Sequence, residues 1–145
     1  MVAAITQKRT GKTVQQLVVY RGGTDSSFTD TDDADILACA SLGIVNGVGN
    51  GRFAPDAHIT REQAATMLVR AAGILDIRAN REHTPFNDAD RISTWAKAAV
   101  AEVSAMQTED GTMVMQGVGS NRFAPSDPYT REQSIMTAYR LFRME

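Results

Sequence analysis

The chain has 145 residues, of which 43% are hydrophobic and 22% charged, and its formal net charge is −2 at pH 7. This length is enough for one compact domain without disulfides or a structural metal. The balanced charge, with no Lys/Arg run longer than residues 8–9, argues against binding to nucleic acid or to an anionic membrane surface, since binders of both kinds usually present a basic face.

Cys39 is the only cysteine, so no intrachain disulfide can form. Its apolar neighbours predict a small buried side chain rather than a nucleophile. No apolar run reaches membrane-spanning length, and residues 1–12 lack the charged start and apolar centre of a secretory signal. If the protein is exported, we therefore expect this chain to be a piece of a longer one.

One helix is predicted within residues 1–27. Residues 1–12 are polar and irregular, and we expect them to be loosely held. Residues 13–21 carry Val14, Leu17 and Val18 on one side, and the following glycine pair is a typical helix stop. With an offset of 50, residues 10–23 align with residues 60–73, so we interpret the segment as a degenerate half-repeat.

The first full unit, residues 28–75, begins with an Asp-rich turn after Phe28. A helix is predicted from about residue 32 to residue 42, where Gly43 should end it. Its expected inward positions recur at helical spacing and are Ile36, Cys39, Ala40 and Leu42.

A glycine-rich loop follows and returns 70 positions later in one register. Residues 47–63 read GVGNGRFAPDAHITREQ and residues 117–133 read GVGSNRFAPSDPYTREQ. The glycines permit unusual backbone angles, the phenylalanine should anchor the loop, and the proline stiffens its exit. Such a duplication predicts a repeat architecture.

Each loop leads into a helix that begins at a Thr-x-x-Gln capping box. In the first unit, Thr60 and Gln63 form the box, and the helix is predicted to run to about Ala72 with Gly73 as its stop. The small side chains that should pack closely against another helix are those of Ala64, Ala65, Leu68 and Ala72. The second copy begins at Thr130 and should end near Leu141.

The second full unit, residues 86–145, follows a charged linker over residues 76–85. Its first helix is predicted over residues 93–106, and residues 107–112 form a polar, turn-rich insertion. The apolar stripe expected on that helix consists of Trp95, Ala99, Val100, Val103 and Met106.

No metal or cofactor is expected. The aspartates that open the two units fail the EF-hand pattern, and helix capping is the preferred account of Asp30, Asp32, Asp33, Asp88 and Asp90. The two histidines, His58 and His83, are isolated and fit no zinc spacing.

The motifs and the order in which they occur make the chain resemble the S-layer homology family. The residues that carry the resemblance are Phe86-Asn-Asp88, Trp95-Ala96, GIVNG at 43–47, GRFAP at 51–55 and ITRE at 59–62. The resemblance implies an all-α fold of helix-loop-helix units, a pseudo-threefold spindle whose third unit is incomplete here. It also implies a non-catalytic anchor, exported to the cell wall or surface of a Gram-positive bacterium, that binds secondary cell-wall polysaccharide, often pyruvylated.

Transfer of the family's binding positions gives five expected ligand residues. Arg61 and Arg131 would meet the acidic substituent of the sugar, Gly47 and Gly117 would bring the loop backbone to it, and Trp95 would be a stacking wall. An Arg at the first position of a capped helix is by itself a suitable receptor for a carboxylate, because its forked donors lie beside the free N–H groups of the helix end.

This chain departs from the family pattern at several places. Thr31 stands where the second unit has Trp95, and the second connection reads Met113-Val114 behind the insertion. The half-repeat lacks the Arg-Glu-Gln that begins the later helices.

Alternatives stay open at every position of the expected site. The arginines could form structural ion pairs, the glycines could serve tight turns only, and Trp95 could be a core anchor. For the whole chain, the alternative is a protein–protein or self-assembly module in which a partner or a second copy completes the third repeat. An enzyme is the weakest hypothesis, because no recognisable motif sets a nucleophile beside a base.

Overall fold

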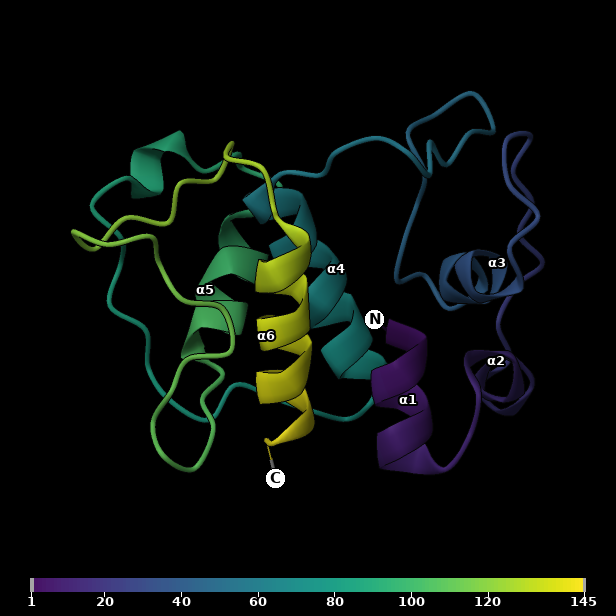
Figure 1. The fold of residues 1–145 in the computed structure, drawn as a ribbon, viewed down its shortest axis with the longest axis horizontal. Coiled ribbons are helices and arrows are strands. Elements are labelled where there is room, and N and C mark those ends of the chain that lie inside the picture. The colour runs from purple at the N-terminus through teal and green to yellow at the C-terminus, as the bar shows by residue number, and fades with distance from the viewer. Residues whose placement is uncertain (1, 145) are drawn as a thin grey trace. The chain divides into compact units, whose positions relative to one another are not determined.

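Six α-helices and one short 3₁₀ helix, with no strand, form the regular structure of residues 2–144, which are the residues that the computed structural model describes (Figure 1). The predicted all-α fold is confirmed. No helix among these residues is long and apolar enough to cross a membrane.

The chain divides into two compact units, one up to Ala57 and the other from His58 onward. This boundary lies inside the sequence repeat 28–75, because the second helix of that repeat, α4, packs with α5, which follows it. A repeat in sequence and a unit of packing are therefore different segments here. The division into repeats at 28–75 and 86–145 stays a prediction.

The first unit begins with α1 (Val2–Thr10). The expectation that residues 1–12 are loosely held is wrong for this segment. Val2 and Ile5 are buried together with Thr6, and burial of an apolar face stabilises a short helix more than its intrinsic propensity does.

Helix α2 (Val14–Arg21) matches the predicted helix over residues 13–21. Thr13 and Gln16 form a capping box, and Gly22 ends the helix in the left-handed conformation. Val14 and Leu17 are buried as expected. The capping box has the same Thr-x-x-Gln spacing as those of the two later helices.

Helix α3 (Ala34–Ser41) packs against α2 and is capped by the side chain of Asp33. Cys39 is buried, and that burial raises the pKa of its thiol to about 11. Gln15 at the start of α2 donates a hydrogen bond of 2.8 Å to the carboxylate of Asp35.

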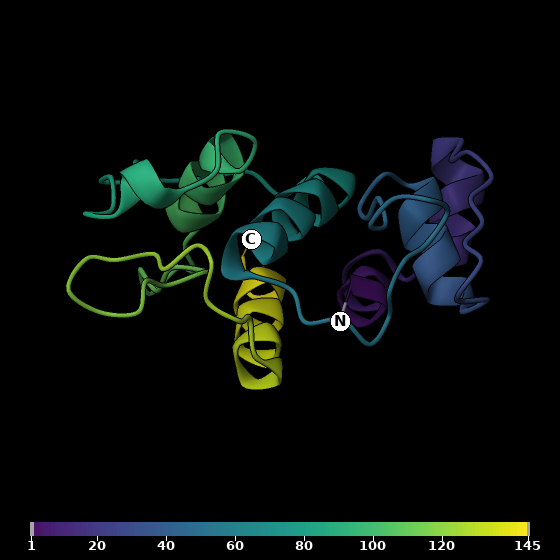
Figure 2. The ribbon, with the colours of Figure 1, turned by 90° about the horizontal axis from the view of Figure 1, so that it is seen from above.

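The second unit contains α4 (Arg61–Ile74), the 3₁₀ helix η1 (Ala89–Arg91), α5 (Lys97–Ala105) and α6 (Arg131–Phe142). Helix α5 packs against α4 (Figures 1 and 2). The predicted small face of α4 is confirmed, since its four residues are all buried: Ala64, Ala65, Leu68 and Ala72.

Gly73 does not stop α4, contrary to the prediction. It lies inside the helix, which ends at Ile74 with Leu75 as its C-cap, and the left-handed residue that follows is Asp76 with φ 56°. Glycine costs a helix interior only about 1 kcal/mol. The burial of Ala71 and Ala72 at the end of α4 outweighs that cost.

Trp95 is not part of the buried stripe predicted for the helix over residues 93–106. Helix α5 begins only at Lys97, so Trp95 lies in the preceding turn, and Ala96 takes the buried position. Val100, Val103 and Met106 are buried as expected.

The insertion at residues 107–112 is a closed polar turn. Asp110 accepts hydrogen bonds from the Thr108 hydroxyl and the Thr112 N–H, and these bonds lower the pKa of Asp110 to about 2. The turn is closed by a bridge between Gln107 and Met113.

Candidate ligand site around the repeated loop

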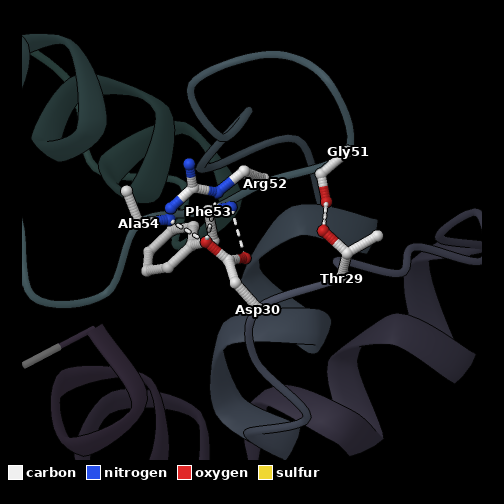
Figure 3. A network of polar contacts seen from close by, with 6 residues as sticks. All are labelled: Thr29, Asp30, Gly51, Arg52, Phe53 and Ala54. Atoms are coloured by element: carbon white, nitrogen blue, oxygen red, sulfur yellow. Dashed lines mark hydrogen bonds and ion pairs between the residues drawn. The ribbon is translucent and has the colours of Figure 1, made fainter.

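The two glycine-rich loops are built in the same way. In the first, the two carboxylate oxygens of Asp30 accept hydrogen bonds from the N–H groups of Phe53 and Ala54, at 2.8 and 2.9 Å (Figure 3). Arg52 completes the network with an ion pair of 3.4 Å to Asp30, and the N–H of Thr29 donates to the carbonyl of Gly51. Successive N–H groups beside a left-handed residue form an anion-binding concavity, and Ala54 has φ 57°.

The second loop repeats this arrangement with Asp88, which accepts from Phe123 and Ala124 at 2.8 Å each. Burial alone would raise the pKa of Asp88, but the two N–H bonds outweigh it and lower that pKa. Helix capping is confirmed for Asp33, whereas it is wrong for Asp30 and Asp88. Both aspartates hold the loops instead. Asp30 lies three residues before the cap of α3, and Asp88 stands at the N-cap position of η1 but makes no side-chain cap bond there.

Gly47 and Gly117 are required by the close packing of these loops. A Cβ on Gly47 would lie 2.5 Å from the Arg52 carbonyl oxygen and 2.7 Å from the Phe28 ring, and Gly47 has φ +69°. A Cβ on Gly117 would lie 2.6 Å from the Arg122 carbonyl oxygen. The tight-turn alternative therefore explains both glycines, while their contact with a ligand stays a prediction.

Arg61 is 3% exposed, and main-chain carbonyls surround its guanidinium. Its Nε donates to the Phe123 carbonyl at 2.8 Å and its Nη2 to the Gln116 carbonyl at 2.6 Å. A third donor, Nη1, bonds the Gln133 side chain, and the guanidinium lies 4.9 Å from the Phe123 ring centre. Burial lowers the pKa of Arg61. Its donors are thus directed at the second loop and the start of α6.

Glu62, the next residue, is also buried, and it is a residue to which the sequence analysis assigned no role in the site. Its carboxylate accepts from the N–H of Ser93 at 2.9 Å and from the Ser93 hydroxyl at 2.8 Å. The motif Thr-Arg-Glu-Gln could have drawn attention to it. The motif contains no information about Ser93, which lies 31 positions away.

Trp95 is 58% exposed. It occupies a turn closed by a hydrogen bond of 2.8 Å from the Ala96 N–H to the Ser93 carbonyl. The core-anchor alternative is therefore not realised, and more than half of this large aromatic residue is open to solvent.

Arg131 lies at the first position of α6, which repeats the capping box of α4. Unlike Arg61, it is exposed. The N–H of Arg61 donates to the carbonyl of Asp127, so the loop that precedes α6 covers the start of α4. At the start of α6, the N–H of Glu132 interacts with that residue's own carboxylate, which lowers the pKa of Glu132.

Four of the five expected site residues lie in the second unit, around the start of α4. Arg61 contacts the loop that contains Gly117, and its neighbour in the helix binds the turn that contains Trp95. The start of α6, with Arg131, adjoins α4 through a bond from the Tyr129 N–H to the Ile59 carbonyl. Gly47 belongs to the first unit.

The comparisons with known proteins agree on one kind of domain. The family model described as S-layer homology domain matches residues 27–65. The endoglucanase of Bacillus sp. (strain KSM-635) is 39% identical over 102 residues, which cover 69% of this chain and 10% of that protein.

Two further relatives are named for the cell surface. The surface layer protein of Brevibacillus choshinensis is 29% identical over 72% of this chain and 9% of its own length. The cell surface protein of Thermoanaerobacter kivui is 30% identical over 74% of this chain and 14% of its own length. The chain thus spans about a tenth of the length of these relatives. No solved structure matches it.

Proposed function

The chain belongs to the S-layer homology family, and on that premise we propose that it is a non-catalytic module that anchors a longer protein at the bacterial cell surface by binding a cell-wall polysaccharide. The predicted family is confirmed by the domain match. The observation that carries the proposal is the exposed Arg131 at a capped helix start, in the same unit as the exposed Trp95.

The chemistry of Arg131 suits an acidic sugar substituent. A guanidinium presents parallel donors to a carboxylate, and the positive end of the α6 dipole adds to the attraction. A pyruvyl ketal provides such a carboxylate on a polysaccharide. We propose that Arg131 binds this group, that the Trp95 ring stacks on a sugar face, and that the Gly117 loop lines the same site.

Arg61 has a different part in this proposal. Its guanidinium already donates to two carbonyls and one amide oxygen, so a ligand would have to displace these bonds to reach it. We assign Arg61 to shaping the second loop and Arg131 to the anion. A ligand role for the Gly47 loop in the first unit rests on the two aspartate-to-loop hydrogen bonds that it shares with the second loop.

The relatives named as enzymes give no reason to assign catalysis to this module. The matched segment is 10% of the Bacillus endoglucanase, and the proposed site holds an arginine and an aromatic ring rather than a nucleophile beside a base. We propose that any activity of the longer protein belongs to its other parts.

Sedimentation with purified cell walls tests the anchor. We expect Arg131→Ala to weaken binding about tenfold, a loss of about 1.4 kcal/mol, and removal of pyruvyl groups from the walls to weaken the wild type similarly. The control is Arg81→Ala, which removes one exposed positive charge from the linker. Equal sedimentation of the two variants would exclude Arg131 from the site.

Protein association is a second candidate function, favoured by the outer side of α6. Large apolar side chains are exposed there, namely Ile135, Met136, Tyr139 and Phe142. Such a patch on a short helix is typical of a protein contact. Light scattering tests it: a dimer that Ile135→Glu converts to a monomer would support association, and a monomer at all concentrations would exclude it.

A further inference from the structure

Two glutamates of identical local sequence have different surroundings. Glu62 and Glu132 both occupy the second position of a helix that begins Thr-Arg-Glu-Gln. Glu62 is 8% exposed and accepts two hydrogen bonds from Ser93, whereas Glu132 is exposed. The local motif therefore does not account for the burial of Glu62, whereas its contact with Ser93 does.

Ser93 is the first residue of the four-residue turn that contains Trp95. The Ser93 carbonyl accepts from the N–H of Ala96 at 2.8 Å and from the N–H of Lys97 at 3.2 Å. Thr94 and Trp95 are thus the central residues of the turn. Its first residue is fixed by Glu62, and its last, Ala96, is fully buried at the start of α5.

The exposure of Trp95 contrasts with the burial around it. An aromatic ring gains free energy when it leaves water, yet Trp95 is 58% exposed between the buried residues Ile92 and Ala96. Any movement of Ser93 away from Glu62 would take both donors from the buried carboxylate, which is costly in a site with little water.

We propose that Glu62 is a positioning residue, which holds the 93–96 turn so that Trp95 stands at the surface as a rigid wall for a sugar ring. This inference rests on the proposed binding of polysaccharide. It adds that the affinity of the Trp95 face depends on a carboxylate of another helix, and that the ligand is a sugar with an apolar face wide enough to stack on an indole.

The first unit has a related contact at this helix position. Gln15 follows the cap Thr13 by the same two positions, and it donates an exposed hydrogen bond to Asp35 in the first turn of α3. The residue that matches Ser93 there is Thr29, so the two contacts join different positions of the repeat. Thr31 stands in the place of Trp95 there, so only the second unit combines such a contact with an aromatic wall.

The only tryptophan of the chain provides a direct readout. We expect Glu62→Ala to increase the fast local motion of Trp95 in time-resolved fluorescence anisotropy. We also expect it to weaken binding to cell walls about tenfold, which corresponds to a loss of about 1.4 kcal/mol in binding free energy. Glu132→Ala is the matched control, with the same motif and an exposed side chain, and it should leave both measurements unchanged.

A second variant distinguishes the loss of positioning from unfolding of the protein. Ser93→Ala removes only the hydroxyl donor, so helicity by circular dichroism should persist while the anisotropy changes in the same direction. Trp95 anisotropy that stays at the wild-type value in both variants would overturn the positioning role. Wild-type binding by Trp95→Ala would instead overturn the sugar contact of Trp95, whatever the anisotropy shows.

Discussion

At the scale of single residues, atoms from distant parts of the sequence decide what each motif does. Gly117 illustrates this, since its missing Cβ makes room for the Arg122 carbonyl and for the Phe86 ring. The Phe86 and Phe123 rings then pack with centres 5.3 Å apart. The loop closes only because glycine leaves this space.

Replacement of Gly117 by Ala should therefore destabilise the second unit. The new Cβ would lie 2.6 Å from a main-chain oxygen, and the backbone shift needed to relieve such overpacking costs about 2 kcal/mol. Urea unfolding measures the change in free energy. A variant as stable as the wild type would show that the loop adapts without cost.

The carboxylate of Asp88 gives a second residue-scale prediction. Asp88→Asn replaces a charged acceptor of two N–H groups by an amide with one oxygen, and hydrogen bonds to charged groups contribute about 2 kcal/mol each. We expect a loss of about that size at neutral pH. Asp90→Asn, at an exposed position two residues on, is the control and should unfold at the wild-type urea concentration.

The comparison of wild type with Asp88→Asn also predicts how stability depends on pH. The folded protein lowers the pKa of Asp88 below its ordinary value of 3.8. Its stabilising contribution is therefore complete above that value and is lost as the pH falls through the lower, folded-state pKa. The stability gap between wild type and Asp88→Asn should narrow below about pH 4, and a constant gap would contradict this assignment.

At the scale of elements, α4 shows how packing overrides local signals. Gly73 reads as a stop, yet α4 continues to Ile74, because the face that it shares with α5 is buried to the end. The nearest atom to a Cβ on Gly73 would be a terminal nitrogen of Arg78 at 3.8 Å. The position thus has room for a side chain.

Gly73→Ala should consequently stabilise the protein by about 1 kcal/mol, the difference in helix propensity between the two residues. A thermal melt followed by circular dichroism measures it. Gly73→Ala and Gly117→Ala should therefore change stability in opposite directions, since the same substitution is favourable in the helix and unfavourable in the loop. A loss of stability at position 73 would show that the end of α4 needs the flexibility of glycine.

Local motifs were sufficient to predict most elements. Capping boxes mark the starts of α4 and α6, and a glycine stop marks the end of α2, because in each case the signal lies within a few residues of the helix end. The partners of Asp88 and Glu62 were not predictable in this way. Asp88 bonds a loop 35 positions later and Glu62 a turn 31 positions later, and one sequence contains no record of such pairs.

At the scale of the whole molecule, the second unit contains the proposed site in full. Arg131, Trp95 and Gly117 all lie in it, together with the helices that bury its core. We expect a fragment of residues 58–145 to keep its helicity and to sediment with cell walls. Circular dichroism and the binding assay check the two parts of this prediction. A folded fragment that no longer binds would show that the first unit contributes to ligand binding.

The buried guanidinium of Arg61 also has a kinetic consequence. Its acceptor on Phe123 lies 62 positions away, so a loop of that length must close before the cation finds its bonds. Long loops close slowly, and contacts of this kind delay the rate-limiting step of folding. Until then an uncompensated charge opposes compaction of the region around α4. The second unit should therefore reach its native state in one late step, after its helices have begun to form.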